Sequence, residues 1–412
     1  MKIKHILIIF ISILISACGG GSSSDNNTTP TPTPAPTPAP QPTVNLNGPN
    51  SSVYTSVEYE ISWTSSNTNS CNAEGSWSGE KSLSGQETFS NAQAGIYTYT
   101  LECTGNNGTS ASDTVDVTVE NNTGTYYRTL TTTDGEVREF IVYVPESASV
   151  LQNVPVVFVI HGTGSNGQEF YDHPEKWTPK ADAEGFIAVY PTALVHCHFV
   201  DGQEMSKTKW ASGNLGESDT QLGGLPLCTN ERLAKDMEFF DEMVDILRTD
   251  YSINDRRIYV TGNSNGAGMG LRLAAERSDI FAAVAVNAGS QSPFLDNVTA
   301  TRPMSIMVTV GTNDNQFAQA INASVPIPIE ESLINSIENI IQPALDVHAL
   351  DTLYEYSESS IGDAMTGEFL FSSSTMGNNN SIRFVIIEGF PHSYSRKLVA
   401  PHWDFLKEQS LP

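Results

Sequence analysis

One serine stands in a local pattern that suits a nucleophile. Ser264 is the centre of Gly262-Asn-Ser264-Asn-Gly266, the only G-x-S-x-G in the sequence. The pattern follows the apolar run 258–261 and precedes a helical run that continues through Leu273. At a sharp turn from strand to helix, glycines two residues to either side relieve backbone crowding, and the hydroxyl is exposed. We therefore predict that Ser264 is the nucleophile of an acyl-transfer reaction.

A serine hydroxyl needs a base, and the base needs an orienting acid, before it attacks near neutral pH. Three histidines follow Ser264, namely His348, His392 and His402. His392 lies in the loop directly after the apolar run 382–387, the last predicted strand, and we predict that it is the base. His402, in a C-terminal helical run, and His348, in a variable segment, are expected to make structural contacts instead.

The predicted acid is Asp314, in the loop that directly follows the penultimate predicted strand, 305–310. Glu388 is the alternative by sequence. It lies only four residues before His392 at the end of the same strand, which is a poor position for reaching the far side of the imidazole.

The oxyanion of a tetrahedral intermediate is stabilised by N–H groups that are already in place. One donor is expected to be the backbone N–H of Asn265, the residue after the nucleophile. The other should come from the glycine-rich loop after the strand 154–160, where glycines let the backbone approach a ligand closely. Either Thr163 or Gly164 fits that role, and the sequence leaves the choice open. His161, which begins this loop, is expected to brace it.

Apolar runs separated by helical stretches must position these groups. A short antiparallel pair, 129–133 and 138–144, is expected to open the domain. The strands predicted to be buried on both faces are 154–160, 186–190, 258–261, 282–286, 305–310 and 382–387. The clearest helix places Leu233, Met237, Phe240, Val244 and Leu247 on one face. This alternation predicts an α/β fold with a largely parallel sheet, whose sites lie at the carboxyl ends of strands.

Over residues 126–412 the chain resembles the polyhydroxybutyrate depolymerase and feruloyl esterase family of α/β-hydrolases. The matching segments are His161-Gly162, Trp210, Asp236-Met-Glu-Phe239, the run from Asp255 to Ala267, the run from Phe281 to Gly289, and Gly311-Thr-Asn-Asp314. The resemblance implies an α/β-hydrolase fold, a Ser264–Asp314–His392 triad, no cofactor, and hydrolysis of a carboxylic ester. The substrate is left open between a hydroxyalkanoate polyester, feruloyl or acetyl groups on polysaccharide, and small esters.

Two residues depart from the family pattern beside the reacting groups. Asn263 stands where Leu or Met is usual, and Tyr394 stands where Trp-Pro usually follows a small residue. We expect both to contact substrate. Trp210 is expected either to line the pocket or to pack in the core. The apolar run 333–345, in a poorly matched stretch, predicts either a lid or a core helix, and we favour the core helix.

The N-terminus has the features of an export signal. Lys2 and Lys4 precede the apolar run 6–15, and the run ends in Ser-Ala-Cys18-Gly, which resembles the bacterial lipoprotein cleavage box. We predict that lipidated Cys18 anchors the chain in the bacterial cell envelope, at the outer membrane or cell surface, with extracellular release as the alternative. An ordinary signal peptide is the competing interpretation. Residues 19–43, rich first in Gly and Ser and then in Pro and Thr, predict a tether.

Residues 44–120 predict a small all-β, immunoglobulin-like sandwich ahead of a catalytic domain at 121–412. Its strands are expected at 57–63, 87–89, 97–103 and 114–119. We expect the module to be a spacer, with polymer binding through exposed aromatic side chains such as Trp77 as the alternative. Export favours disulfides, and we predict the pairs Cys71–Cys103 and Cys197–Cys228.

Composition limits the range of functions. The formal net charge of −26 argues against binding of nucleic acid, since an acidic surface repels phosphate. His196-Cys197-His198 predicts no metal site, because three adjacent residues cannot converge on one ion. A monomer is expected. A serine peptidase of related fold and a non-catalytic surface-binding lipoprotein remain as alternatives to the esterase.

Overall fold

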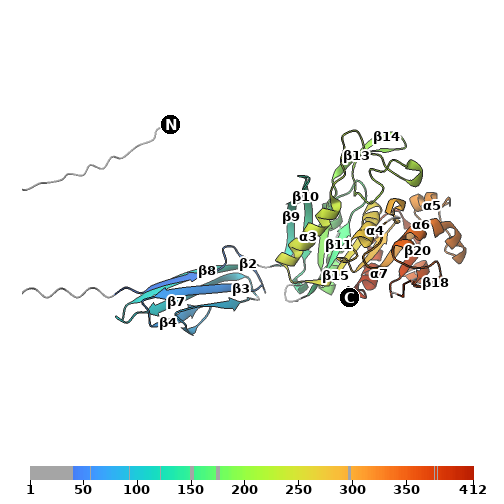
Figure 1. Cartoon of the computed structure of the whole chain (residues 1–412). Coiled ribbons are helices and arrows are strands. Elements are labelled where there is room, and N and C mark those ends of the chain that lie inside the picture. Colours follow the sequence, from blue (N-terminus) through green and yellow to red (C-terminus); the bar gives the residue numbers. More distant parts are fainter. Residues whose placement is uncertain are drawn as a thin grey trace, which may run out of the picture. The chain divides into compact units, whose positions relative to one another are not determined.

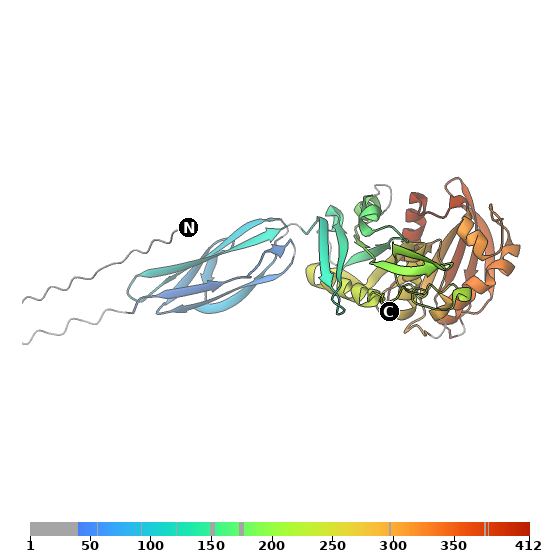
Figure 2. The same cartoon turned by 90° about the horizontal axis from the view of Figure 1, so that it is seen from above.

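The structure is a computed structural model that describes residues 40–412 except 56, 92, 121, 149–152, 173–176, 296–297, 375 and 378. The predicted signal peptide and lipid attachment at Cys18, and nearly all of the tether, lie outside the described residues. Figures 1 and 2 show a β module and an α/β domain, which are described separately below. None of the helices in the described part of the chain combines the length and the apolar composition needed to cross a lipid bilayer.

The β module is a sandwich of two sheets. Its described strands are β1 (Thr43–Asn47), β2 (Val53–Tyr54), β3 (Tyr59–Ser66), β4 (Ser70–Gly75), β5 (Gly79–Lys81), β6 (Ser84–Phe89), β7 (Gly95–Thr104) and β8 (Ser110–Glu120). One sheet has the order β1-β3-β6 and the other the order β2-β8-β7-β4-β5. Alternate residues of β3 and β7, among them Ile61 and Leu101, fill the core between the sheets. Apolar residues at a period of two therefore close the sandwich.

Trp77 belongs to this core. It is only 6 % exposed, packs edge-on against Trp63 with ring centroids 5.3 Å apart, and its Nε1 donates to the Thr100 carbonyl. The expectation that Trp77 is an exposed binding aromatic is therefore wrong. No alternating pattern indicates its burial, because Trp77 lies in the link between β4 and β5 rather than on a strand.

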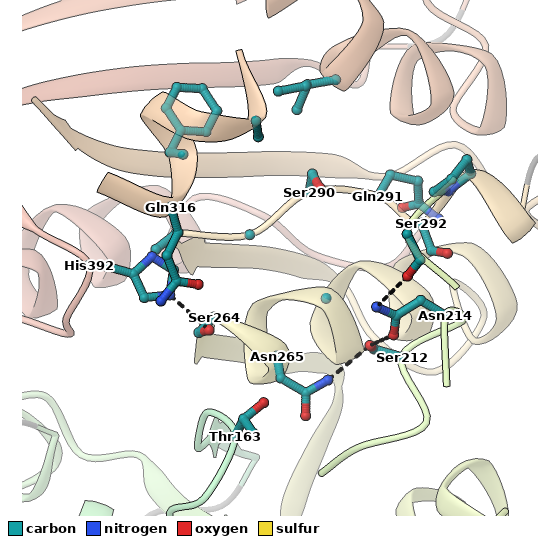
Figure 3. A pocket seen from close by; sticks show the side chains of 18 of the residues that line it. Thr163, Ser212, Asn214, Ser264, Asn265, Ser290, Gln291, Ser292, Gln316 and His392 are labelled. Carbon is teal, nitrogen blue, oxygen red and sulfur yellow. Dashed lines mark hydrogen bonds between the residues drawn. The ribbon is translucent and has the colours of Figure 1, made fainter. Parts of the chain in front are cut away.

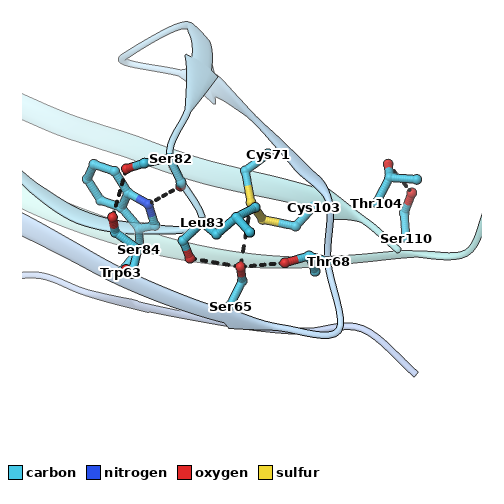
Figure 4. The surroundings of a disulfide bond; sticks show 10 residues. All are labelled: Trp63, Ser65, Thr68, Cys71, Ser82, Leu83, Ser84, Cys103, Thr104 and Ser110. Carbon is cyan, nitrogen blue, oxygen red and sulfur yellow. Dashed lines mark hydrogen bonds between the residues drawn. A yellow bond between two sulfur atoms is a disulfide. The ribbon is translucent and has the colours of Figure 1, made fainter. Parts of the chain in front are cut away.

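The disulfide of the module joins Cys71 on β4 to Cys103 on β7. The two cysteines stand opposite one another in an antiparallel pair, as Figure 4 shows. The bridge thus links neighbouring strands of one sheet and does not cross between the two sheets.

The α/β domain is built on one mixed sheet, which has ten strands within the described residues. They are β9 (Gly124–Thr131), β10 (Val137–Val144), β11 (Val154–Ile160), β12 (Ile187–Pro191), β15 (Ile253–Asn263), β16 (Ala283–Asn287), β17 (Ser305–Asn313), β18 (Tyr354–Ile361), β19 (Ala364–Phe371) and β20 (Ile382–Pro391). The order is β18-β19-β20-β17-β16-β15-β11-β12-β10-β9. Strands β20 to β12 in this order are parallel, and antiparallel pairs close both edges. The sheet is therefore the mostly parallel one that the sequence predicts.

Helices cover both faces of the sheet (Figures 1 and 2). They are α1 (Gly167–Tyr171), α2 (Thr178–Glu184), α3 (Asp236–Asp250), α4 (Asn265–Glu276), α5 (Asn315–Ala320), α6 (Ile334–Val347) and α7 (Val399–Lys407). A small hairpin, β13 (Val195–Val200) and β14 (Gln203–Thr208), stands apart from the sheet. In β11, Val156 and Phe158 join the core beneath α3, α4 and α6, whereas Val157 and Val159 join the core beneath α2 and α7. Burial on both faces explains the continuous apolar runs.

Two parts of the domain differ from the sequence-based expectations. Leu233 is exposed and precedes α3, so the buried face of that helix begins after it. The edge strands β18 and β19 were not predicted. The run 333–345 forms α6, which buries Ile337 and Ile341 in the core, so the interpretation as a core helix is confirmed.

Candidate active site

Ser264 occupies a strained turn between β15 and α4. Its φ of 55° and ψ of −120° are unusual for a residue with a side chain. A Cβ added to Gly262 would lie 2.5 Å from the Gly266 carbonyl oxygen, and one added to Gly266 would lie 2.3 Å from the Ile160 carbonyl oxygen. Both glycines are therefore required by close backbone contacts.

The structure brings Ser264, His392 and Asp314 together from the carboxyl ends of three strands. His392 Nε2 lies 2.9 Å from Ser264 Oγ, and His392 Nδ1 lies 2.8 Å from Asp314 Oδ2. These distances allow Nδ1–H to donate to the carboxylate while Nε2 accepts the serine proton. Glu388, the alternative acid, is exposed and accepts a hydrogen bond from the Met365 backbone instead.

Asp314 is fully buried and caps the N-terminus of α5. Its Oδ1 accepts from the backbone N–H groups of Gln316 and Phe317 at 3.0 and 2.9 Å, which leaves Oδ2 for His392. Burial by itself would raise the pKa of this carboxyl. The hydrogen bond from His392 and those from the two backbone N–H groups outweigh burial and hold the pKa below its ordinary value. Asp314 is thus ionised over the range in which a histidine acts as a base.

The candidate oxyanion donors lie beside Ser264. Asn265 is the first residue of α4, so its backbone N–H has no acceptor within the helix. Gly164 is excluded as the second donor, because its N–H already donates to the Thr208 carbonyl at 2.9 Å. Thr163 lines the cleft with Ser264 and Asn265. The structure therefore favours Thr163 where the sequence left two choices.

A cleft of about 510 Å³ opens onto Ser264 and His392. Its lining residues are Thr163, Lys209, Ser212, Asn214, Gly223, Ser264, Asn265, Gly268, Ala288, Gly289, Ser290, Gln291, Ser292, Pro293, Gln316, Phe317, Ala320, Ile340 and His392. Figure 3 shows Asn214, Gln291 and Ser292 grouped on one side, away from His392 and Gln316. One wall of the cleft is thus rich in hydroxyl and amide groups.

Gln291 and Lys209 are cleft residues that sequence reasoning missed. Gln291 is 3 % exposed, and among the described residues neither atom of its amide has a hydrogen-bond partner. Neither residue belongs to a motif, and no spacing singles them out, because both lie in irregular segments between elements. Only the tertiary structure places them beside the nucleophile.

Trp210, Asn263 and Tyr394 are corrections to the predicted substrate contacts, since none of them lines the cleft among its described residues. Trp210 is fully buried, and its backbone N–H donates to the Asn265 side chain at 2.7 Å. It therefore packs beneath the nucleophile. The Asn263 side chain accepts from Asn287 Nδ2 at 2.7 Å. Both residues support the site from behind.

The Tyr394 hydroxyl points into the domain and not into the cleft. It accepts from Trp177 Nε1 at 3.0 Å, lies 3.2 Å from Thr261 Oγ1 and lies 3.3 Å from His402 Nδ1. His402 is buried, and burial lowers its pKa to about 3, so this histidine is neutral. The hydroxyl and imidazole groups fix the loop that carries His392, which lies two residues before Tyr394.

The other predicted structural roles can be located as well. His161 Nε2 accepts from the Ala193 N–H at 3.0 Å, and His161 Nδ1 lies 2.7 Å from the Gly162 carbonyl oxygen, which fits a bracing role. Burial lowers the His161 pKa to about 4. His348 is buried and accepts from the Met304 N–H. A disulfide joins Cys197 to Cys228.

The sequence comparisons match the two parts of the chain separately. Residues 37–119 match a family of PKD domains, and residues 235–347 match the family described as BAAT / Acyl-CoA thioester hydrolase C terminal. A bifunctional acetylxylan esterase/xylanase of Neocallimastix patriciarum is 27 % identical over 184 residues, which is 44 % of this chain and 22 % of that protein. A feruloyl esterase B of Talaromyces stipitatus is 27 % identical over 175 residues, 40 % of this chain and 42 % of that protein. The chain thus spans less than half the length of these relatives.

Solved structures resemble the chain at low sequence identity. The acetyl xylan esterase from Aspergillus awamori aligns over 68 % of this chain and 99 % of its own, with 16 % identity and a TM-score of 0.43. A ferulic acid esterase from Anaeromyces mucronatus aligns over 69 % and 90 %, with 16 % identity and a TM-score of 0.37. The sheet order, the strand directions and the family matches define the architecture. The chain joins a PKD-like β-sandwich to a domain of the α/β-hydrolase fold.

Proposed function

We propose that this chain is a serine carboxylester hydrolase whose triad is Ser264, His392 and Asp314. The observation that carries the proposal is the continuous hydrogen-bonded chain from Ser264 Oγ through the His392 imidazole to the buried Asp314 carboxylate. A serine held in a strained turn, opposite an oriented imidazole, is the arrangement that acyl transfer needs. The sequence relatives named as acetylxylan and feruloyl esterases support the same reaction.

The reaction follows from the geometry. Ser264 Oγ attacks the ester carbonyl carbon while its proton passes to His392 Nε2, and the carbonyl electron pair moves to oxygen. The N–H groups of Asn265 and Thr163 stabilise that oxyanion. His392 then gives the proton to the departing alcohol, which leaves an acyl-serine. Water, deprotonated by His392, attacks the acyl carbon and returns Ser264 to its starting state.

We further propose that the alcohol part of the substrate is a sugar in a polysaccharide that carries feruloyl or acetyl groups. The unpartnered Gln291 amide supports this, because an amide that both donates and accepts suits a hydroxyl. Asn214 and Ser292 add polar groups on the same side of the cleft. A hydroxyalkanoate polyester has few donors to offer this wall, and it is the second candidate.

The test is an assay of the full chain on methyl ferulate, acetylated xylan, p-nitrophenyl acetate and polyhydroxybutyrate film. We expect a burst of p-nitrophenol near one equivalent per chain, abolished in Ser264→Ala and retained in the matched control Ser252→Ala, an exposed serine outside the cleft. Folded protein that cleaves none of these esters would refute the esterase. Polyester cleavage without sugar-ester cleavage would refute the sugar.

A thioester is a second class of substrate that the comparisons raise. The match of residues 235–347 to a family with acyl-CoA thioester hydrolase in its description favours adding acetyl-CoA to the panel. The same triad would cleave it, with a thiol in place of the alcohol. Faster turnover of acetyl-CoA than of every oxygen ester would reassign the substrate while keeping the mechanism.

We also propose that lipidated Cys18 holds the chain in the cell envelope and that the β module is a spacer. The burial of Trp77 supports the spacer, since it removes the aromatic candidate for polymer binding. Labelling with a radioactive fatty acid should mark the wild type and not Cys18→Ser. Label on both proteins would refute the anchor. Sedimentation of the full chain with insoluble xylan, independent of the cleft, would refute the spacer.

A further inference from the structure

Lys209 is a buried cation beside the candidate oxyanion hole. It follows β14, lines the cleft with Ser264, and is only 9 % exposed. Its Nζ donates to Thr163 Oγ1 at 3.2 Å. Within the described residues no carboxylate pairs with it.

Such an ammonium is costly to keep in a folded protein. Moving a charge out of water without an opposite charge beside it lowers stability. Burial is also the cause that lowers the Lys209 pKa, to about 8. A lysine in this position is explained by a negative charge that is absent at rest and develops during the reaction.

The titratable groups on neighbouring elements do not supply that charge. They are His392 across the cleft, Lys207 on β14, Glu169 on α1, and Arg138 on β10, which pairs with Asp236 of α3. None of them is among the causes of the Lys209 pKa shift. Thr163, which accepts the hydrogen bond from the Lys209 ammonium, is neutral.

We propose that Lys209 is a positioning residue for the oxyanion hole, fixing Thr163 through its hydroxyl and adding a positive field toward the oxyanion. The inference rests on the proposed esterase function. When the ester carbonyl becomes tetrahedral, its oxygen gains the charge beside the Thr163 N–H. A buried ammonium one side chain away stabilises that charge strongly, because little water screens it. The ground-state ester is neutral there, so Lys209 acts mainly on the transition state.

The experiment compares Lys209→Met, Lys209→Arg and the matched control Lys207→Met, an exposed lysine two residues away on β14. Loss of one direct oxyanion donor costs about 100- to 1000-fold in kcat. Lys209 stands one group further out, so we expect Lys209→Met to lower kcat by about 10- to 100-fold with little change in KM. Lys207→Met should retain wild-type kcat.

The pH profile gives a readout that a structural role would not move. In the wild type, kcat/KM should fall above about pH 8 as Lys209 loses its proton. That limb should be absent in Lys209→Met, and it should move to higher pH in Lys209→Arg, which stays charged. Lys209→Met should also unfold at a temperature no lower than the wild type, because it removes an unpaired buried charge.

Two results would overturn the proposal. The first is a Lys209→Met enzyme with wild-type kcat on p-nitrophenyl acetate. The second is a variant that loses stability and activity together while keeping the wild-type alkaline limb, which is the signature of a packing role. If the wild type shows no hydrolysis that depends on Ser264, the proposed function fails, and the role of Lys209 fails with it.

Discussion

His402 should make the α/β domain sensitive to acid. This histidine lies between Thr261 and Thr309, at 3.2 Å from each hydroxyl oxygen, and burial lowers its pKa to about 3. In the unfolded chain a histidine titrates near 6.5. The unfolded state therefore binds a proton first, and stability that is present above about pH 6.5 is lost as the pH falls toward 3. Between pH 7 and pH 5 the loss from this one group is about 2 kcal/mol.

The assay is urea unfolding of the wild type and of His402→Gln at steps from pH 8 to pH 5. Replacing the buried imidazole will cost stability at every pH. The difference in unfolding free energy should narrow by about 2 kcal/mol between pH 7 and pH 5, because the variant has no imidazole to protonate. Effects of the net charge of −26 are shared by both proteins and cancel in the difference. A difference that stays constant across this range would show that His402 titrates normally, and it would refute the buried neutral network.

Three further substitutions test the support of the site. Gly266→Ala should lower kcat/KM by about 100-fold or prevent folding, since its Cβ would collide with backbone oxygen; an active, stable variant would contradict the turn described above. Tyr394→Phe should lower kcat by about tenfold with KM unchanged, because the loop of His392 loses its inner anchor; a change confined to KM would return Tyr394 to the substrate pocket. Arg138→Met should lower the free energy of unfolding by about 3–5 kcal/mol, measured in urea, because Asp236 would be left as a buried unpaired charge; a loss below about 1 kcal/mol would show the pair to be solvated.

The sequence by itself determined the reacting groups and the strands that carry them. A nucleophile at a strand–helix turn needs glycine on either side, and parallel strands buried on both faces need continuous apolar runs. Both are local demands that a residue pattern records. For the same reason Ser264, Asp314 and His392 could be chosen, because each follows a recognisable strand and the carboxyl ends of parallel strands meet at one edge of the sheet.

Only the tertiary structure decided what surrounds those groups. Trp210 and Tyr394 were expected at the substrate, yet the fold turns both inward, since burial of an aromatic side chain depends on packing partners far away in sequence. Lys209 and Gln291 carried no local signal and lie in irregular segments that the fold brings to the cleft. A side chain's charge and hydrogen-bond deficit exist only relative to its neighbours, and the tertiary structure alone supplies those neighbours.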